Sequence, residues 1–174
     1  MKSSLVELIM VMTLLVLFGV TIFTLMYSGA DTQDRIMRDK NTQIDARIAV
    51  SYINVKLRQN DAMNKGVDNQ TKIGVQPISL TGRNAIVIRE RTIDYEYDTW
   101  IYEYEGKLYE MLTDPDNEPN PDNWDMGFYI VDVGAMETVF NKDDGTITNT
   151  VYYSNTNDLG NFDKISTTIR LRSY

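Results

Sequence analysis

The residues of this chain that could do chemistry are nearly all carboxylates. There are 25 Asp and Glu side chains against 17 Lys and Arg, with no Cys and no His. The missing Cys and His remove thiolate nucleophiles, disulfides, imidazole bases and most zinc or copper sites. The functional interpretation therefore depends on the carboxylates, and two settings for them stand out: one glutamate inside an apolar run, and one loop crowded with acids.

Glu7 is the only charged residue in the apolar run from Leu5 to Tyr27. At about 1.5 Å of rise per residue, a helix over this run would be roughly 34 Å long, enough to cross the hydrocarbon core of a membrane. A carboxylate in such a segment costs roughly 2.5 to 3.5 kcal/mol near the bilayer centre and less near an end, so it usually has a partner or a role. Glu7 is therefore predicted to dock against another subunit; the alternative is that it reaches the cytoplasmic headgroups.

The loop from Thr113 to Asp125 is the second acidic setting. Carboxylate oxygens suit calcium, but an EF-hand counted from Asp114 would need glycine at its sixth position and glutamate at its twelfth. This chain has Pro119 and Asp125 there. An irregular calcium loop and a solvated acidic turn region both remain open. The carboxylates concerned are Asp114, Asp116, Glu118, Asp122 and Asp125.

Neither an enzyme nor a direct nucleic-acid binder is expected. The spacing of the carboxylates selects no acid–base pair, and the sequence has no glycine-rich phosphate loop, serine nucleophile elbow or metal-ligand cluster. The formal net charge is −8, all of it carried by residues 31–174. That sign opposes binding to phosphate backbones and to anionic lipid surfaces. Apart from the calcium candidate, no cofactor is expected.

The apolar run is predicted to be a retained membrane anchor. A cleavable signal peptide is the main alternative, because Ser28, Gly29 and Ala30 resemble a small-residue cleavage site. Against cleavage, the run is about twice the usual signal core and contains a glutamate. Lys2 and the terminal amine should stay cytoplasmic, which places the residues after the anchor outside the cell. A helix buried in a soluble core is disfavoured, because too little of the chain remains to surround it.

The helical pattern continues beyond the anchor. No proline interrupts residues 30–63, which are rich in helix-compatible side chains of mixed charge. Apolar residues recur at helical spacing and form one stripe, which predicts a surface covered by another part of the protein. Gly66 is expected to end the helix; a separate stalk after a break at Ser28-Gly29 is the alternative. The stripe consists of Met37, Ile44, Ile48, Tyr52 and Val55.

After Gly66 the pattern changes to period two, with many aromatic and β-branched residues. Glu105-Gly106 and Asp144-Gly145 are typical hairpin turns, so antiparallel pairing is expected. The aromatic residues of 100–104 share one face, which is predicted to lie on the helix stripe. The predicted strands are 73–80, 84–91, 93–98, 100–104, 107–112, 127–133, 146–154 and 165–171.

Together these elements predict an α+β protein. Its long N-terminal helix is membrane-spanning in the first half and amphipathic in the second, and it packs on an antiparallel β-sheet. The expected division is 1–4 as a short cytoplasmic start, 5–27 as the transmembrane helix, 28–65 as its amphipathic continuation and 66–174 as the β domain.

This architecture, with Leu5-Val6-Glu7 at the head of a long apolar helix, resembles the type IV pilin and pseudopilin superfamily. The likeness at the level of motifs covers about Ser3 to Met26. Members of the superfamily carry a glutamate as the fifth residue after prepilin cleavage. Counting back from Glu7 makes Ser3 the first residue, where members usually have an aromatic one, and puts Lys2 in the place of the family's glycine. The stretches AVSYINVKLRQNDA and WIYEYEGKLYEML are also similar to a Gram-positive set of pilin-like proteins and to minor pseudopilins.

The resemblance implies a minor pilin or pseudopilin-like structural subunit of a type IV pilus, a secretion system or a DNA-uptake filament. Its partners would be other pilin-like subunits and the membrane assembly machinery. Glu7 would set the subunit register by binding the terminal amine of a neighbour, which belongs to Ser3 if the chain is cleaved before it. With an uncleaved start, Lys2 or the Met1 amine could serve instead. Two other functions stay open: a monomeric, single-span extracellular binding or sensing domain, and a secreted binding protein cleaved near Ala30.

Overall fold

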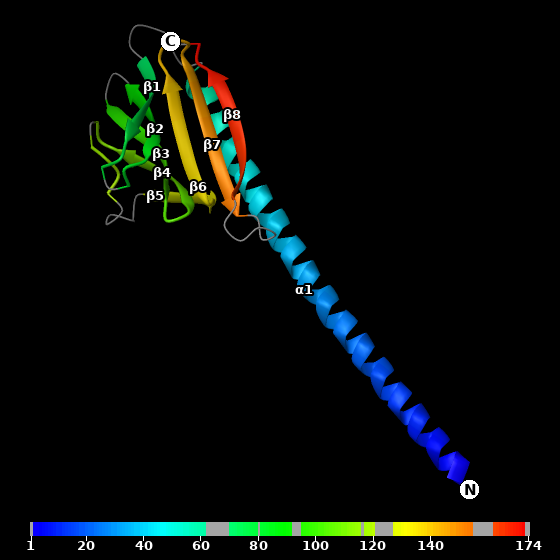
Figure 1. Ribbon diagram of the computed structural model, residues 1–174. Helices are drawn as coiled ribbons and strands as arrows, with labels where there is room; N and C mark the ends of the chain where they lie inside the picture. Colours follow the sequence, from blue (N-terminus) through cyan, green and yellow to red (C-terminus); the bar gives the residue numbers. More distant parts are fainter. Residues whose placement is uncertain are drawn as a thin grey trace. The chain divides into compact units, whose positions relative to one another are not determined.

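One continuous helix, α1 (Lys2–Asp61), runs through both compact units of the protein (Figure 1). The computed structural model describes residues 2–61, 70–79, 81–91, 95–115, 117–120, 127–154 and 162–172, without the side chains of 2–4, 70 and 71. The two units are Met1–Lys40 and Asn41–Tyr174, called here the N-terminal and C-terminal units. Because α1 is helical throughout, the alternative of a break at Ser28-Gly29 is wrong. The expected helix end at Gly66 lies outside the described residues.

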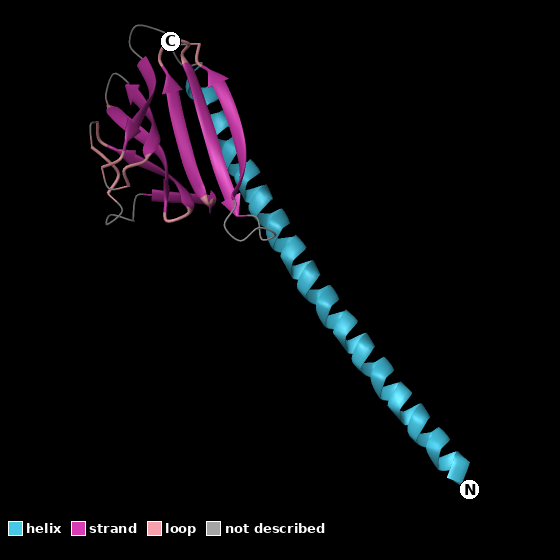
Figure 2. Cartoon of the chain, viewed as in Figure 1, coloured by secondary structure: helices cyan, strands magenta, loops and turns pink. Residues whose placement is uncertain are grey.

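The C-terminal unit combines the last part of α1 with antiparallel strands, and this confirms the predicted α+β fold (Figure 2). Its described strands form a five-stranded sheet in the order β1-β2-β3-β4-β5 and a three-stranded sheet in the order β6-β7-β8. The strands are β1 (Gln70–Pro77), β2 (Asn84–Arg91), β3 (Glu96–Tyr104), β4 (Lys107–Thr113), β5 (Gly127–Asp132), β6 (Ala135–Asn141), β7 (Thr146–Ser154) and β8 (Phe162–Arg170).

The predicted strands at 84–91 and 146–154 are confirmed to the residue, whereas two other predictions need correction. The separate strands 93–98 and 100–104 are replaced by one strand, β3, because the ladder continues through the buried Thr99. Strand β6 was not predicted at all. One of its inward positions is the buried Thr138, whose hydroxyl donates to Asn149 Oδ1 at 2.9 Å, and this polar residue weakens the apolar alternation.

The predicted hairpin at Glu105-Gly106 is confirmed, and its backbone explains the glycine. Both residues have positive φ, 49° for Glu105 and 76° for Gly106, as a two-residue type I′ turn requires. The N–H of Val133 donates to the carbonyl of Gly106 at 2.8 Å. A Cβ on Gly106 would lie 3.1 Å from the Val133 carbonyl oxygen. The turn therefore needs glycine both for its conformation and for this close approach.

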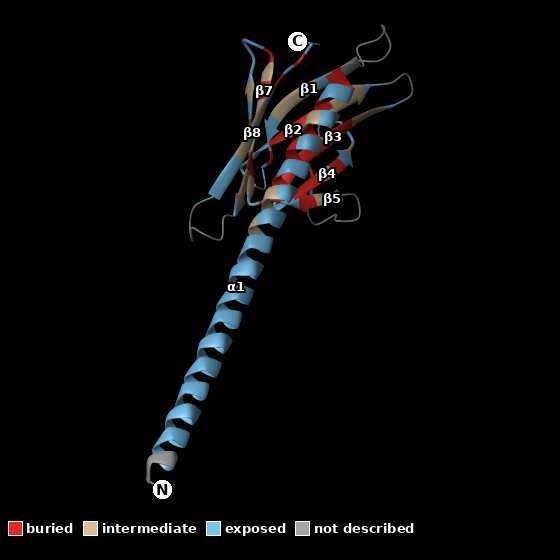
Figure 3. Cartoon of the chain, turned by 90° about the vertical axis from the view of Figure 1, so that its right-hand side faces the viewer, coloured by how far each residue is buried: buried red, intermediate tan, exposed pale blue. Residues whose placement is uncertain are grey.

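Inside the C-terminal unit, α1 packs through a face of small and medium-sized residues (Figure 3). Ala46, Ala49, Ile53 and Leu57 are fully buried, and Val50 is nearly so. Their spacing of three and four residues places them on one side of the helix. They share a single core with apolar residues from both sheets, among them Ile86, Ile88, Ile101, Leu108, Val131, Met136, Ile147, Val151 and Ile169.

The expectation that the sheet would cover the predicted helix stripe is wrong. The exposed fractions of Met37, Ile44, Ile48 and Val55 are 57%, 51%, 46% and 49%, and only the half-buried Tyr52 packs against the core. Val55 follows the buried Ala46 by roughly two and a half helical turns, so the two point to opposite sides. The large apolar residues do lie on one side of the helix, as predicted. However, the side that packs closely against the sheets is the opposite one, which carries the alanines.

The aromatic face of β3 was also assigned to the wrong side of the sheet. Trp100 and Tyr102 form a second buried cluster with Tyr109 and Met111, separate from the core that contains α1. Ile101, on the other face of the same strand, belongs to the core with the helix. Strand alternation predicted the two faces correctly but could not tell which of them meets α1.

Because Ala49 is fully buried between α1 and the sheets, enlarging it should force the helix away. We expect Ala49→Leu to lower the free energy of unfolding by about 1 to 3 kcal/mol, as overpacked core sites do. Urea unfolding of the full chain in detergent micelles measures this value. The adjacent and exposed Ile48→Leu is the matched control and should stay within about 0.5 kcal/mol of wild type. Equal losses in both variants would contradict the assigned packing face.

Candidate functional site

The N-terminal unit exposes every large apolar side chain of the predicted anchor. Exposed fractions between Leu5 and Tyr27 run from 41% at Ile22 to 74% at Tyr27. Helix α1 is, by length and composition, long and apolar enough to cross a membrane. The hydroxyls of Thr13, Thr21 and Thr24 donate to carbonyls one turn earlier, at 2.8, 2.6 and 2.9 Å. These bonds give the three hydroxyls partners inside the helix, so they would not be left unsatisfied in hydrocarbon.

The predicted docking residues lie at the start of this helix. Glu7 is exposed, and the described residues provide no ion-pair partner for it. Lys2 and Ser3 belong to α1, but their side chains lie outside the described part of the chain. The docking role of these three residues stays a prediction.

A second candidate surface is the apolar face that α1 leaves uncovered in the C-terminal unit. Ile44, Ile48 and Val55, called here the exposed stripe, are each about half exposed. They follow one another at four and seven residues, which returns to nearly the same direction on a helix. The stripe lies on the side of α1 opposite the buried alanines, so no described part of this chain covers it.

The acidic loop is only partly described, and its described carboxylates make other contacts. Glu118 accepts hydrogen bonds from the backbone N–H of Ser79 at 2.9 Å and from its hydroxyl at 3.0 Å. Asp114 is exposed, and Asp116, Asp122 and Asp125 lie outside the described residues. In the part of the chain that the structure describes, no group of three or more acids could hold a metal ion. Calcium binding by this loop stays a prediction.

The described end of this loop has a structural role beside the second cluster. Pro119 is buried, and the hydroxyl of Thr113 donates to the carbonyl of Asn117 at 2.9 Å. The same hydroxyl accepts the indole N–H of Trp100 at 2.9 Å. These bonds, together with those of Glu118, tie the loop to the strands that carry the second cluster.

A polar contact joins α1 to β4 at the edge of the helix core. The Tyr52 hydroxyl donates to Glu110 Oε2, and the Lys56 ammonium binds Glu110 Oε1 at 2.8 Å. Burial raises the pKa of the Glu110 carboxyl. Both carboxylate oxygens of Glu110 already accept a hydrogen bond from α1. The geometry therefore fits a structural contact between helix and sheet rather than a catalytic acid.

Two carboxylates influence each other electrostatically near the start of the buried helix segment. The pKa of Asp45 on α1 is raised by its burial first and by the charge of Asp132 second. Asp132 ends β5 and is exposed, and burial first and Asp132 second raise the pKa of the Tyr129 hydroxyl. Lys107 faces Asp132 in the ladder, but its ammonium lies 5.9 Å from the Tyr129 ring centre. No ion pair joins Lys107 to either carboxylate among the described residues.

A comparison with protein families gives one match. Residues 44–154, more than half of the chain, match the family described as a domain of unknown function, DUF4860. The chain belongs to this family. The matched region of the DUF4860 protein begins in α1 and ends with β7, so it lies within the C-terminal unit and does not include the apolar run. Searches among curated proteins and among solved structures found no match.

Sequence reasoning missed the charged groups of this DUF4860 protein that tertiary structure assembles. Glu110 and Lys56 are 54 residues apart in the chain, and Asp45 is still further from Asp132. Each looks like an ordinary surface residue in its own segment. The only available signal was alternation in β4, which puts Glu110 on the same face as the buried Leu108.

The raised pKa of Asp45 predicts how stability responds to pH. A carboxyl whose folded pKa lies above its unfolded value stabilises the fold most in acid, and this contribution is lost as the pH rises through the folded pKa. Asp45→Asn should therefore raise the melting temperature at neutral pH, and the difference from wild type should vanish below about pH 4. Thermal melting across this pH range is the measurement. Asp143→Asn, the same change at an exposed position, is the control. A lower melting temperature for Asp45→Asn at neutral pH would contradict the prediction.

Proposed function

We propose that this DUF4860 protein is a membrane-anchored, pilin-like structural subunit that assembles with other pilin-like subunits into an extracellular filament or secretion complex. The observation that carries the proposal is helix α1. Its first part exposes apolar side chains on all sides, and the same helix then forms part of the core of a folded α+β unit. A simple membrane anchor does not need to continue as one helix into the folded unit. In a subunit that is extracted from a membrane into a helical assembly, this continuous helix connects the folded unit to the helices in the centre of the assembly.

The exposed stripe supports assembly. Burial of apolar surface contributes roughly 25 cal/mol per Å², so half-exposed Ile44, Ile48 and Val55 would gain stability from a partner. The stripe is on a helix, and a helix face with apolar residues at such spacing is a common docking element. In the proposed assembly, this face packs against neighbouring subunits.

The proposed orientation keeps the N-terminus in the cytoplasm and the C-terminal unit outside the cell. Lys2 lies just before the apolar run, and loops on the cytoplasmic side carry an excess of positive charge. In this arrangement Glu7 lies near the cytoplasmic end of the anchor. There it binds an amine from a neighbouring subunit, because a carboxylate in hydrocarbon is strongly attracted to a cation.

Removing the charge of Glu7 tests the docking role. Glu7→Gln should leave the chain in the membrane, because a neutral amide is easier to insert than a carboxylate. Its recovery in sheared surface filaments or secretion complexes should fall by roughly tenfold or more, since losing one partner of a buried ion pair costs about 3 to 5 kcal/mol. Quantitative immunoblots of the membrane and sheared fractions of cells that produce the full chain give both values.

Thr21→Ala is the control for Glu7→Gln. It also removes a polar group from the anchor, but the Thr21 hydroxyl is bonded within its own helix, to the carbonyl of Leu17. It should assemble like wild type. Equal recovery of Glu7→Gln and wild type in the sheared fraction would remove the docking role.

A polar substitution in the exposed stripe tests the second surface. Ile48→Gln should change the free energy of unfolding by less than about 0.5 kcal/mol, because the side chain is half exposed. It should nevertheless reduce assembly, because the apolar contact is lost. Arg47→Gln, an exposed neighbour that points elsewhere on the helix, introduces the same amide and should assemble normally. Cross-linking yields of the full chain in membranes compare the two. Identical yields would show that partners do not use the stripe.

A further inference from the structure

The buried face of α1 in the C-terminal unit is graded in size along the helix. In chain order, its fully or nearly fully buried apolar residues are Ala46, Ala49, Val50, Ile53 and Leu57. The small residues are thus the ones nearest the apolar run in the sequence, and the large ones follow. Protein interiors are packed as closely as organic crystals, so each site between helix and sheets fits the side chain that it holds.

This gradation opposes a displacement of α1 toward its N-terminus. A shift by one turn, about 5.4 Å, brings each residue close to the site of the residue four positions earlier. Ile53 would then enter the site of Ala49, and overpacking of this kind is destabilising because the neighbours have no space to yield. The same shift would move Asp61 into the site of Leu57 in the apolar core, where a carboxylate is strongly disfavoured.

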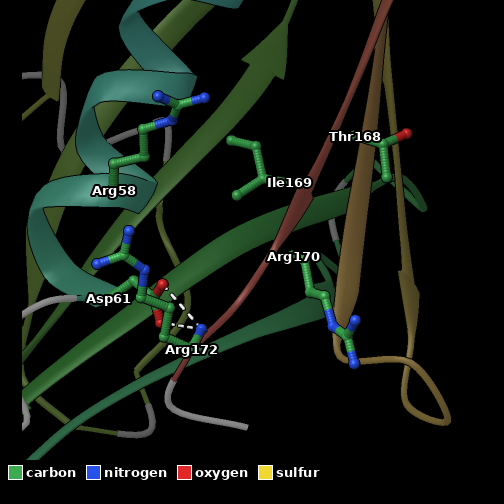
Figure 4. A pocket seen from close by; sticks show the side chains of 6 residues that line it. All are labelled: Arg58, Asp61, Thr168, Ile169, Arg170 and Arg172. Carbon is green, nitrogen blue, oxygen red and sulfur yellow. Dashed lines mark hydrogen bonds between the residues drawn. The ribbon is translucent and has the colours of Figure 1, made fainter.

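A polar contact at the C-terminal end of α1 resists the same displacement (Figure 4). The backbone N–H of Arg172 donates to both carboxylate oxygens of Asp61, at 2.8 Å each. Asp61 is buried, so breaking this contact would leave a buried charged group without its donor. The segment that holds Asp61 is itself fixed to the sheet, because the N–H of Leu171 donates to the carbonyl of Gly145 at 2.8 Å.

Strand β8 runs alongside α1 in the same direction, so a load along the helix acts on many contacts at once. The Thr42 hydroxyl donates to the carbonyl of Ser154 at 3.1 Å, and Ser154 pairs with Phe162 at the start of β8. Asp61 binds Arg172, just after the end of β8. Figure 1 shows β7 and β8 lying along the last part of α1. An axial load therefore shears the helix against the sheet and does not peel its contacts apart one by one.

Such a load arises when the apolar run is held in a membrane and the C-terminal unit is pulled away from it. The chain passes from the N-terminal unit to the C-terminal unit once, within α1. The force between the two therefore passes through this helix, and it pulls the helix toward its N-terminus relative to the sheets.

We propose that the size-graded face of α1, together with the contact of Asp61 with Arg172, is a mechanical stop that keeps α1 in the sheets under axial load. The proposal rests on the membrane anchoring in the proposed function, but not on assembly with other subunits. Its test is made on single chains, so failure of the stop and failure of assembly are distinguished.

Force spectroscopy of the full chain in detergent micelles tests the mechanical stop, and the absence of native Cys lets two introduced cysteines carry the handles. Handles at Gln33→Cys on α1 and Val139→Cys on β6, both exposed positions, load the helix along its axis. In this background Leu57→Ala should shorten the lifetime of the folded C-terminal unit at constant force by roughly tenfold or more, because forced unfolding depends on the barrier that the stop raises.

Ile101→Ala is the matched control, because Ile101 is fully buried in the same core but lies on β3. Urea unfolding should give losses of stability of similar size for Ile101→Ala and Leu57→Ala. Under axial load, Leu57→Ala should nevertheless unfold clearly faster. Handles at Leu112→Cys and Val139→Cys, both exposed, pull on the two sheets without loading α1 along its axis, and should remove this difference.

Two outcomes would overturn the proposal. One is equal lifetimes of Leu57→Ala and Ile101→Ala under axial load. The other is a difference that persists with the handles on the two sheets, because it would then reflect core stability alone.

Asp61→Asn repeats the test if Leu57→Ala fails to fold, as judged by circular dichroism. An amide accepts through one oxygen only, so the lifetime under axial load should still fall by roughly threefold or more. A wild-type lifetime for Asp61→Asn would likewise overturn the proposal.

Discussion

The close packing of Ala46 and Ala49 against the two sheets is the contact on which the rest of the C-terminal unit depends. Two fully buried alanines let the helix backbone approach the strands, and Ile53 and Leu57 continue the same face into the core. This contact fixes the rotation of α1 about its own axis. Every other property of the helix surface follows from that rotation, including which apolar residues remain exposed and which charged residues reach the sheet.

The same helix meets two different environments along its length. Between Leu5 and Tyr27 its apolar residues are exposed on all sides, whereas in the C-terminal unit one face is buried and the opposite face carries Ile44, Ile48 and Val55. Apolar surface of this extent is unfavourable in water at roughly 25 cal/mol per Å². A lipid bilayer would cover the first part, and a protein partner the second. The proposed filament provides both, because it receives subunits from a membrane and packs their helices together.

Most of the described polar groups that look functional in isolation have structural partners. Glu118 holds the Ser79 turn, Glu110 fastens Tyr52 and Lys56 to the sheet, and Asp61 binds the backbone of the C-terminal segment. These carboxylates therefore stabilise the fold of the C-terminal unit.

The sequence by itself determined the elements of this protein, because helix and strand periods, turn glycines and a membrane-length apolar run are local properties. It predicted the continuous helix, strands β2 and β7 to the residue, and the turn at Glu105-Gly106. It did not determine which side of α1 or of β3 faces the core. Both sides of each element are apolar enough to be buried, so the choice depended on packing between distant segments, which for α1 buried the face with the alanines. Contacts such as those of Glu110 with Lys56, or of Asp61 with Arg172, join residues far apart in the chain, and only the folded structure brings them together.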